Sequence, residues 1–131
     1  MEHVRIDRSK GELPVSLRSH FQGEARVQPL PNPFGEGPAV FAVHFEPGGR
    51  TRPHLHRSGQ VLHVSFGEGI VADRSRRRIV RAGDVVTVMP GEWHWHGATP
   101  ASPMTHVTVQ MSGPDETDWD VEEGDWASGY D

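Results

Sequence analysis

The chain has 131 residues and a formal net charge of −5, with 13 Lys and Arg against 18 Asp and Glu. This length suits one domain, because two halves would each be too small to bury a core. The acidic balance argues against a nucleic-acid partner, since phosphate binding needs a dominant basic face. Cysteine is absent, which excludes disulfides, thiol nucleophiles, iron–sulfur clusters and thiolate zinc sites.

The composition also indicates where the protein works and what kind of fold it has. No apolar run approaches the roughly 18 residues of a membrane span, and the start, MEHVRIDRSKGEL, lacks the apolar segment of a signal peptide. We therefore expect a cytoplasmic protein without a membrane partner. The 15 glycines and 11 prolines amount to about a fifth of the chain, against an average of about 12%. Such a content is typical of short strands joined by tight turns.

Residues 1–38 are irregular and predict an arm and a loop, with at most one edge strand, that belong to the same domain as the rest. Scattered apolar positions are followed by a stretch dense in proline and glycine, PLPNPFGEGP at 29–38. His3 and His20 lie in this arm, and we expect both to be exposed to solvent.

Residues 39–112 predict an all-β core. Six segments have the alternation or the apolar character of strands: 39–45, 60–66, 69–73, 76–80, 84–89 and 104–111. Their spacing of roughly ten residues is typical of a sandwich or barrel. Phe41 and Val43 share the inward face of the first strand. His44 and His63 have the opposite parity, which places them on the outer face or at a subunit interface.

Residues 113–131 predict an acidic tail packed on the barrel. Trp119 and Trp126 are seven residues apart and would share one face of a helix. We therefore expect a short helix that docks through these two rings.

The histidines form a pattern that suits a metal ion. His54 and His56 are two residues apart, so both imidazoles point to one face of an extended chain, and Gln60 has the same parity. His94 and His96 repeat the arrangement near the end of a later strand. Three imidazoles and one amide oxygen that meet inside a barrel suit a divalent first-row ion such as Zn, Fe, Ni or Mn.

These residues resemble the two sequence motifs of the cupin family. The first motif is matched by Gly48, His54, His56, Gln60 and Gly67, and the second by Gly83, Pro90, Gly91 and His94. The resemblance implies a small single-cupin barrel, a jelly roll or double-stranded β-helix. The chain departs from the family twice: Gln60 stands where a glutamate is usual, and Ala98 where an asparagine is usual.

Three shorter segments narrow the resemblance. WHGATP at 95–100, MTH at 104–106 and DW at 118–119 are similar to small bacterial cupins related to carboxymuconolactone-decarboxylase-type cupins, a group that includes the manganese-dependent cupin hydroxynitrile lyases. The resemblance implies one divalent ion per chain, manganese before iron, zinc or nickel, and a homodimer or higher homo-oligomer. It implies as metal ligands His54, His56, Gln60 and His94, and as catalytic or supporting groups His96 and His106.

The ligand set suggests a reaction. Four neutral donors leave the full 2+ charge of the ion uncompensated, which favours an anionic ligand such as cyanide, an alkoxide or a carboxylate. His106 is the candidate base, and His96 would orient the substrate or share the proton. We expect the pocket walls to be formed by Phe41, Val43, Thr51, Thr108 and Gln110, with Arg52 near the mouth.

A lyase that cleaves a C–C bond of a small organic substrate, as in cyanohydrin cleavage, is the leading hypothesis. Two alternatives stay open, an Fe(II) dioxygenase and a non-catalytic cupin that binds or senses a small molecule. The fold by itself does not decide among them, because one fold hosts many chemistries.

Overall fold

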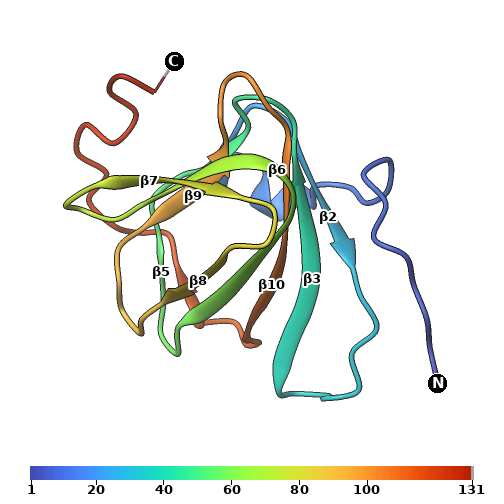
Figure 1. The fold of residues 1–131 in the computed structure, drawn as a ribbon. Helices are drawn as coiled ribbons and strands as arrows, with labels where there is room; N and C mark the ends of the chain where they lie inside the picture. Colours follow the sequence, from blue (N-terminus) through green and yellow to red (C-terminus); the bar gives the residue numbers. More distant parts are fainter. Residues whose placement is uncertain (131) are drawn as a thin grey trace.

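The computed structural model describes residues 1–130 and shows an all-β barrel whose two termini lie on opposite sides (Figure 1). Its elements, in chain order, are the 3-10 helix η1 (Val15–His20) and the strands β1 (Phe21–Gln22), β2 (Ala25–Pro29), β3 (Pro38–Phe45), β4 (Arg50–Thr51), β5 (Leu55–His56), β6 (Gln60–Ala72), β7 (Arg77–Arg81), β8 (Val85–Val88), β9 (Trp95–Ala98), β10 (Met104–Met111) and β11 (Thr117–Asp118). Within these residues no helix is long and apolar enough to cross a membrane.

One sheet of nine strands makes the barrel wall. Its order is β1-β4-β9-β6-β10-β3-β2, with β7 and β8 also paired to β6, and β11 pairs separately with β5. Strand β6 is the common element, because it contacts β10 and β8 at its start and β9 and β7 at its end. This arrangement confirms the predicted all-β barrel.

The predicted strands are found, with one difference at Gly67. The segments expected at 60–66 and 69–73 form a single strand, β6, which continues through Gly67 and pairs antiparallel with β7. Gly67 has φ +77°, and a Cβ there would lie 1.8 Å from the carbonyl oxygen of Pro103. The residue therefore lets β6 pass close to the chain just before β10 without interrupting the strand.

Two apolar clusters hold the barrel together. The main core lies between the strands and includes Phe45, Leu62 and Met104, all almost fully buried. A second cluster packs Trp95 of β9 against Trp126 and Tyr130 of the tail. On β10, Met104, His106 and Thr108 are all buried, and Thr105 is buried as well, on the opposite face, where its hydroxyl contacts His44.

The N-terminal arm is more ordered than predicted and buries His44. Instead of at most one edge strand, residues 1–38 contain η1 and the two strands β1 and β2. His44 has the predicted outward orientation, but its side chain is buried because the arm covers β3 at this point. Gln28 Oε1 lies 2.9 Å from its Nε2 and Thr105 Oγ1 lies 2.8 Å from its Nδ1. His63, in contrast, is exposed as expected.

Residues 113–130 of the C-terminal tail contain no helix. Instead of forming a helix, residues 117–118 pair with β5, and residues 124–129 form turns. The pairing to β5 satisfies main-chain groups and keeps this part of the tail extended. Trp119 and Trp126 consequently contact different parts of the barrel: Trp119 stacks on His20, at 4.2 Å between ring centroids, and Trp126 packs on Trp95. His20 is thus partly covered by an indole and is less exposed than predicted.

Candidate metal centre

Three histidines meet inside the barrel, as the sequence predicts. His54 and His94 form a β-bridge in which each backbone N–H donates to the other's carbonyl at 3.0 Å. His56 follows on β5, on the same face as His54. One ring nitrogen of each residue lies within 4.8 Å of the others, and all three side chains are buried. The bridge between His54 and His94 thus brings together two segments that lie 40 residues apart in the chain.

The outer ring nitrogen of each histidine is held by the protein. His54 Nδ1 donates to the carbonyl of Arg52 at 2.7 Å, and His94 Nδ1 donates to the carbonyl of Glu92 at 3.0 Å. A carbonyl can only accept, so both Nδ1 atoms carry the proton and both Nε2 atoms keep a lone pair. His56 differs, because its Nδ1 lies 3.1 Å from the hydroxyl of Thr117 on β11.

Gln60 supplies an oxygen at the same place. Its Oε1 lies 3.2 Å from His94 Nε2, while its Nε2 donates to Gln110 Oε1 at 2.8 Å. Gln110 therefore fixes which way the Gln60 amide faces and directs the oxygen toward the histidines. The four predicted ligands lie together in the structure.

Burial keeps these imidazoles neutral. It holds the pKa of His54 well below its usual value of 6.5, with the neighbouring His94 and His56 acting in the same direction. Burial, followed by the influence of His94, lowers the pKa of His56 to about 4. Burial also lowers the pKa of His94. A neutral imidazole is the form that binds a metal ion.

The donor set fits a divalent ion. The Nε2 atom of His56 is buried and has no hydrogen-bond partner, although buried polar atoms are nearly always paired. The cluster found among residues 1–130 consists of three histidines without a carboxylate. Three imidazole nitrogens with a nearby amide oxygen match the preferences of first-row divalent ions.

A mostly apolar cavity of about 150 Å³ adjoins the centre. All five predicted wall residues line it: Phe41, Val43, Thr51, Thr108 and Gln110. Arg52 does not line it and instead forms an ion pair with Glu123 at 3.1 Å. Sequence reasoning missed five lining residues, namely Leu17, Phe21, Val27, Thr117 and Trp119. The first three lie in the irregular N-terminal part, which has no pattern that signals a pocket.

A chain of buried polar groups ends at this cavity. Thr108 Oγ1 lies 3.0 Å from His106 Nδ1, and His106 Nε2 lies 3.0 Å from His96 Nδ1. Both nitrogens of His106 are thus engaged, whereas the buried His96 Nε2 has no partner. Burial lowers the pKa of His106 to about 3 and, together with the nearby His106 and His54, holds the pKa of His96 well below 6.5.

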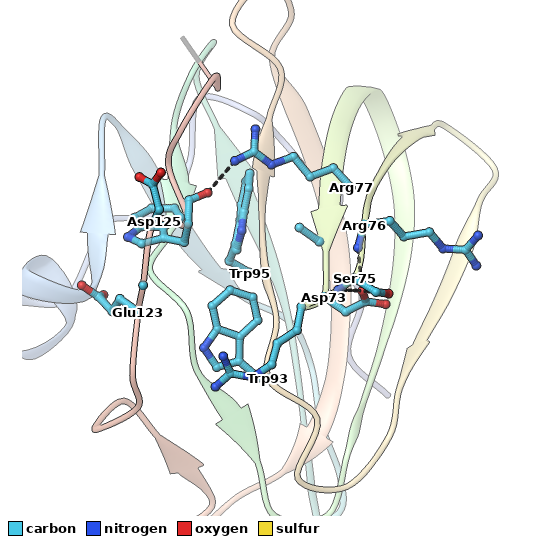
Figure 2. A pocket seen from close by; sticks show the side chains of 12 residues that line it. Asp73, Ser75, Arg76, Arg77, Trp93, Trp95, Glu123 and Asp125 are labelled. Atoms are coloured by element: carbon cyan, nitrogen blue, oxygen red, sulfur yellow. Dashed lines mark hydrogen bonds between the residues drawn. The ribbon is translucent and has the colours of Figure 1, made fainter.

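A second, more open cavity of about 350 Å³ lies between the β6–β7 turn and the tail (Figure 2). Several of its polar groups form hydrogen bonds within the protein. The Asp73 carboxylate accepts hydrogen bonds from Ser75 and the backbone of Arg76, and Arg77 donates to the carbonyl of Trp126 at 2.6 Å. The first two contacts close the β6–β7 turn and the third anchors the tail, so the cavity beside the histidines remains the candidate site.

Barrel and site together define a small single-domain β-barrel protein with a buried histidine centre. The chain belongs to the cupin family: residues 41–110 match the family described as Cupin domain. This family assignment confirms the one expected from the two histidine motifs.

Comparison with known proteins gives more specific similarities. The chain is 44% identical over 95 residues, 69% of its length and 70% of the relative's, to a protein named (R)-mandelonitrile lyase from Granulicella tundricola. A solved cupin-like protein from Thermotoga maritima is 33% identical, with a TM-score of 0.74 over 90% of this chain and 88% of that one. The polyketide cyclase RemF from Streptomyces resistomycificus shares the fold at 18% identity, with a TM-score of 0.71 over 96% and 92% of the two chains.

Proposed function

We propose that this protein is a metal-dependent lyase that cleaves the C–C bond of a cyanohydrin to give a carbonyl compound and hydrogen cyanide. The observation that carries the proposal is the buried Thr108–His106–His96 chain, which ends at an unpaired nitrogen in a cavity beside three converging histidines. The similarity to a protein named (R)-mandelonitrile lyase supports the same reaction class.

His54, His56, Gln60 and His94 would hold the ion, which we propose to be Mn²⁺. Bound there, a divalent ion acts as a Lewis acid that stabilises negative charge on an oxygen or on cyanide. The ligands are all neutral, so the protein itself cancels none of the ion's charge. Gln110 keeps the Gln60 amide in the ligand orientation through its 2.8 Å hydrogen bond.

We propose that His96, whose Nε2 is unpaired, takes the proton in place of His106 acting alone. In one proton arrangement His96 Nδ1 donates to His106 Nε2, His106 Nδ1 donates to Thr108, and His96 Nε2 offers a lone pair to the substrate hydroxyl. That hydroxyl proton moves to His96, the C–C bond breaks, and its electron pair leaves with cyanide as the C=O bond forms.

The reverse transfer completes the reaction. His96 Nε2–H returns the proton to cyanide, giving hydrogen cyanide, while His106 accepts or supplies the proton at His96 Nδ1. His106 therefore lies behind His96 in the relay, whereas its sequence-based role was to contact the substrate directly. Thr108 ends the chain at the barrel wall.

The cavity walls suit a small apolar substituent on the carbinol carbon. Phe41, Val43 and Phe21 line the space next to the histidines, and their apolar surface favours an aryl or alkyl group over a charged one. An aromatic cyanohydrin such as mandelonitrile is therefore the substrate with which to begin.

Substitution of His96 and His106 tests the proposal. With Mn²⁺-loaded protein and mandelonitrile, release of benzaldehyde followed by absorbance should fall about 100-fold or more in His96→Ala and His106→Ala, the range for loss of a general base. Metal content should stay unchanged in both variants. His63→Ala, which alters an exposed histidine on the outer face, serves as the control and should retain full activity.

Other outcomes would point to the alternatives. Unchanged cleavage in His96→Ala would exclude the relay. Substrate-dependent oxygen uptake by the iron-loaded protein, without cyanohydrin cleavage by any loaded form, would identify a dioxygenase. Metal binding without turnover of any substrate would identify a binding or sensing cupin.

A further inference from the structure

The C-terminal segment 113–126, called here the strap, is built into the wall of the metal centre. Its strand β11 pairs antiparallel with β5, so that Thr117 lies opposite His56. The backbone N–H of Arg57 donates to the carbonyl of Glu116 at 2.8 Å, and the N–H of Ser58 donates to the Glu116 carboxylate at 2.6 Å. The strap therefore pairs with the chain both before and after the candidate ligand His56.

Thr117 holds His56 in a way that differs from its two neighbours. The rings of His54 and His94 are each fixed by a carbonyl two residues earlier in their own segment. The His56 ring is fixed by a side chain 61 residues away, the Thr117 hydroxyl at 3.1 Å from its Nδ1. When this hydroxyl accepts the Nδ1 proton, the unpaired and buried Nε2 is left as the donor atom at the centre.

The strap also touches a second candidate ligand. The indole of Trp119 lies 4.3 Å from the imidazole of His54, between ring centroids, and both Trp119 and Thr117 line the cavity. Beyond this point Glu123 is paired with Arg52. The far end is anchored independently, because Arg77 donates to the Trp126 carbonyl next to Trp95 (Figure 2).

We propose that Thr117 is a positioning residue of the metal centre and that docking of the strap and binding of the ion stabilise each other. The inference rests on the metal site of the proposed function. If the docked strap orients His56, a bound ion must by linkage stabilise the docked strap to the same extent. The coupling lies between residues 114–119 and the ion, whereas the anchored end at Trp126 should respond little.

Metal affinity of Thr117 variants tests the positioning role. Titration of the full chain with MnCl₂ in a calorimeter should show a Kd raised about 10- to 100-fold in Thr117→Val, the range for removing a partner of a ligand histidine. Thr117→Ser keeps the hydroxyl and should bind within about threefold of the wild type. Thr87→Val, the same change at an exposed position of β8, is the matched control and should not alter the Kd.

Hydrogen exchange measured by mass spectrometry tests the coupling. Mn²⁺ should slow exchange in peptides covering 114–119 of the wild type, and this protection should be reduced in Thr117→Val at saturating metal. Exchange at 114–119 that is indifferent to bound Mn²⁺, or equal affinity of Thr117→Val and the wild type, would overturn the inference and leave the metal site intact. A wild type that binds neither Mn²⁺ nor Fe²⁺, Zn²⁺ or Ni²⁺ would overturn the metal site itself.

Discussion

At the scale of single residues, the centre of the barrel is organised by which ring nitrogen of each histidine is occupied. His54 and His94 give their Nδ1 protons to backbone carbonyls, and His106 has both nitrogens engaged. Two ring nitrogens of the centre have no hydrogen-bond partner, His56 Nε2 and His96 Nε2, and we infer different functions for them. The first belongs to the cluster that can hold an ion, and the second belongs to a residue that lines the cavity where we propose a substrate reacts.

The same burial predicts how stability depends on pH in the metal-free protein. The folded-state pKa values of His56 and His106 are lowered to about 4 and about 3, below the 6.5 of an exposed histidine. Below pH 6.5 the unfolded chain therefore binds protons that the folded chain does not. The free energy of unfolding should be greatest above pH 6.5 and fall by about 1.4 kcal/mol per pH unit for each such histidine as the pH drops toward 4.

Chemical denaturation in EDTA at pH 7.5, 6.0 and 5.0 measures this slope. In His106→Gln the free energy of unfolding should depend less steeply on pH, by the contribution of one histidine. Stability that is the same at pH 7.5 and pH 5.0 would contradict the assignment of these buried, neutral rings.

At the scale of elements, the period of two along the strands predicted most of the site. It placed His54 with His56, and it placed His106 with Thr108 on the inward face of β10, because side chains in a strand alternate regardless of what covers them. It placed His44 on the outer face correctly, but it did not predict that the arm buries this side chain. The helical spacing used for the tail was the wrong period, because Trp119 and Trp126 dock on separate parts of the barrel rather than along one helix face. The local alternation of polar and apolar residues does not show whether a segment distant in the sequence covers a strand.

Gly67 allows a sharp test of the close contact between β6 and the chain before β10. Gly67→Ala would place a methyl group 1.8 Å from the Pro103 carbonyl oxygen, so we expect a loss of about 3 kcal/mol or more in the free energy of unfolding. Gly91→Ala is the matched control, because Gly91 has nearly the same φ, +76° against +77°, but nothing within 4 Å of the added methyl. It should lose only about 1 kcal/mol, the strain of a left-handed backbone.

Urea denaturation of the two variants measures the difference. Equal losses in both would mean that backbone conformation alone, and not the crowding by Pro103, makes glycine necessary at position 67.

At the scale of the whole molecule, the outer face of four adjacent strands carries no charged side chain. Val61 of β6 lies opposite Val109 of β10, which lies opposite Val40 of β3, and Thr87 of β8 flanks Val61 on the other side. Val61 and Val109 are 39% and 38% exposed. Since 24% of the chain is charged, such a face is unusual for a surface that meets only water.

We expect a second copy of the chain to cover this face and form a homodimer. A face without charges avoids like-charge repulsion when it is rotated onto itself, as a twofold interface requires. Light scattering during gel filtration should give twice the chain mass for the wild type and the monomer mass for Val61→Glu. Ile79→Glu, at an exposed position of β7, should remain dimeric. A monomeric wild type would contradict the expectation.

The contribution of the strap to the cavity wall has a practical consequence for handling the protein. Tyr130 is buried against Trp95, so an affinity tag fused behind it would displace this ring and, with it, the anchor at Trp126 that keeps the strap docked. Met1, by comparison, is fully exposed and lies on the opposite side of the barrel (Figure 1). Purification through an N-terminal tag should therefore preserve ion loading, whereas a C-terminal tag should reduce it in side-by-side preparations.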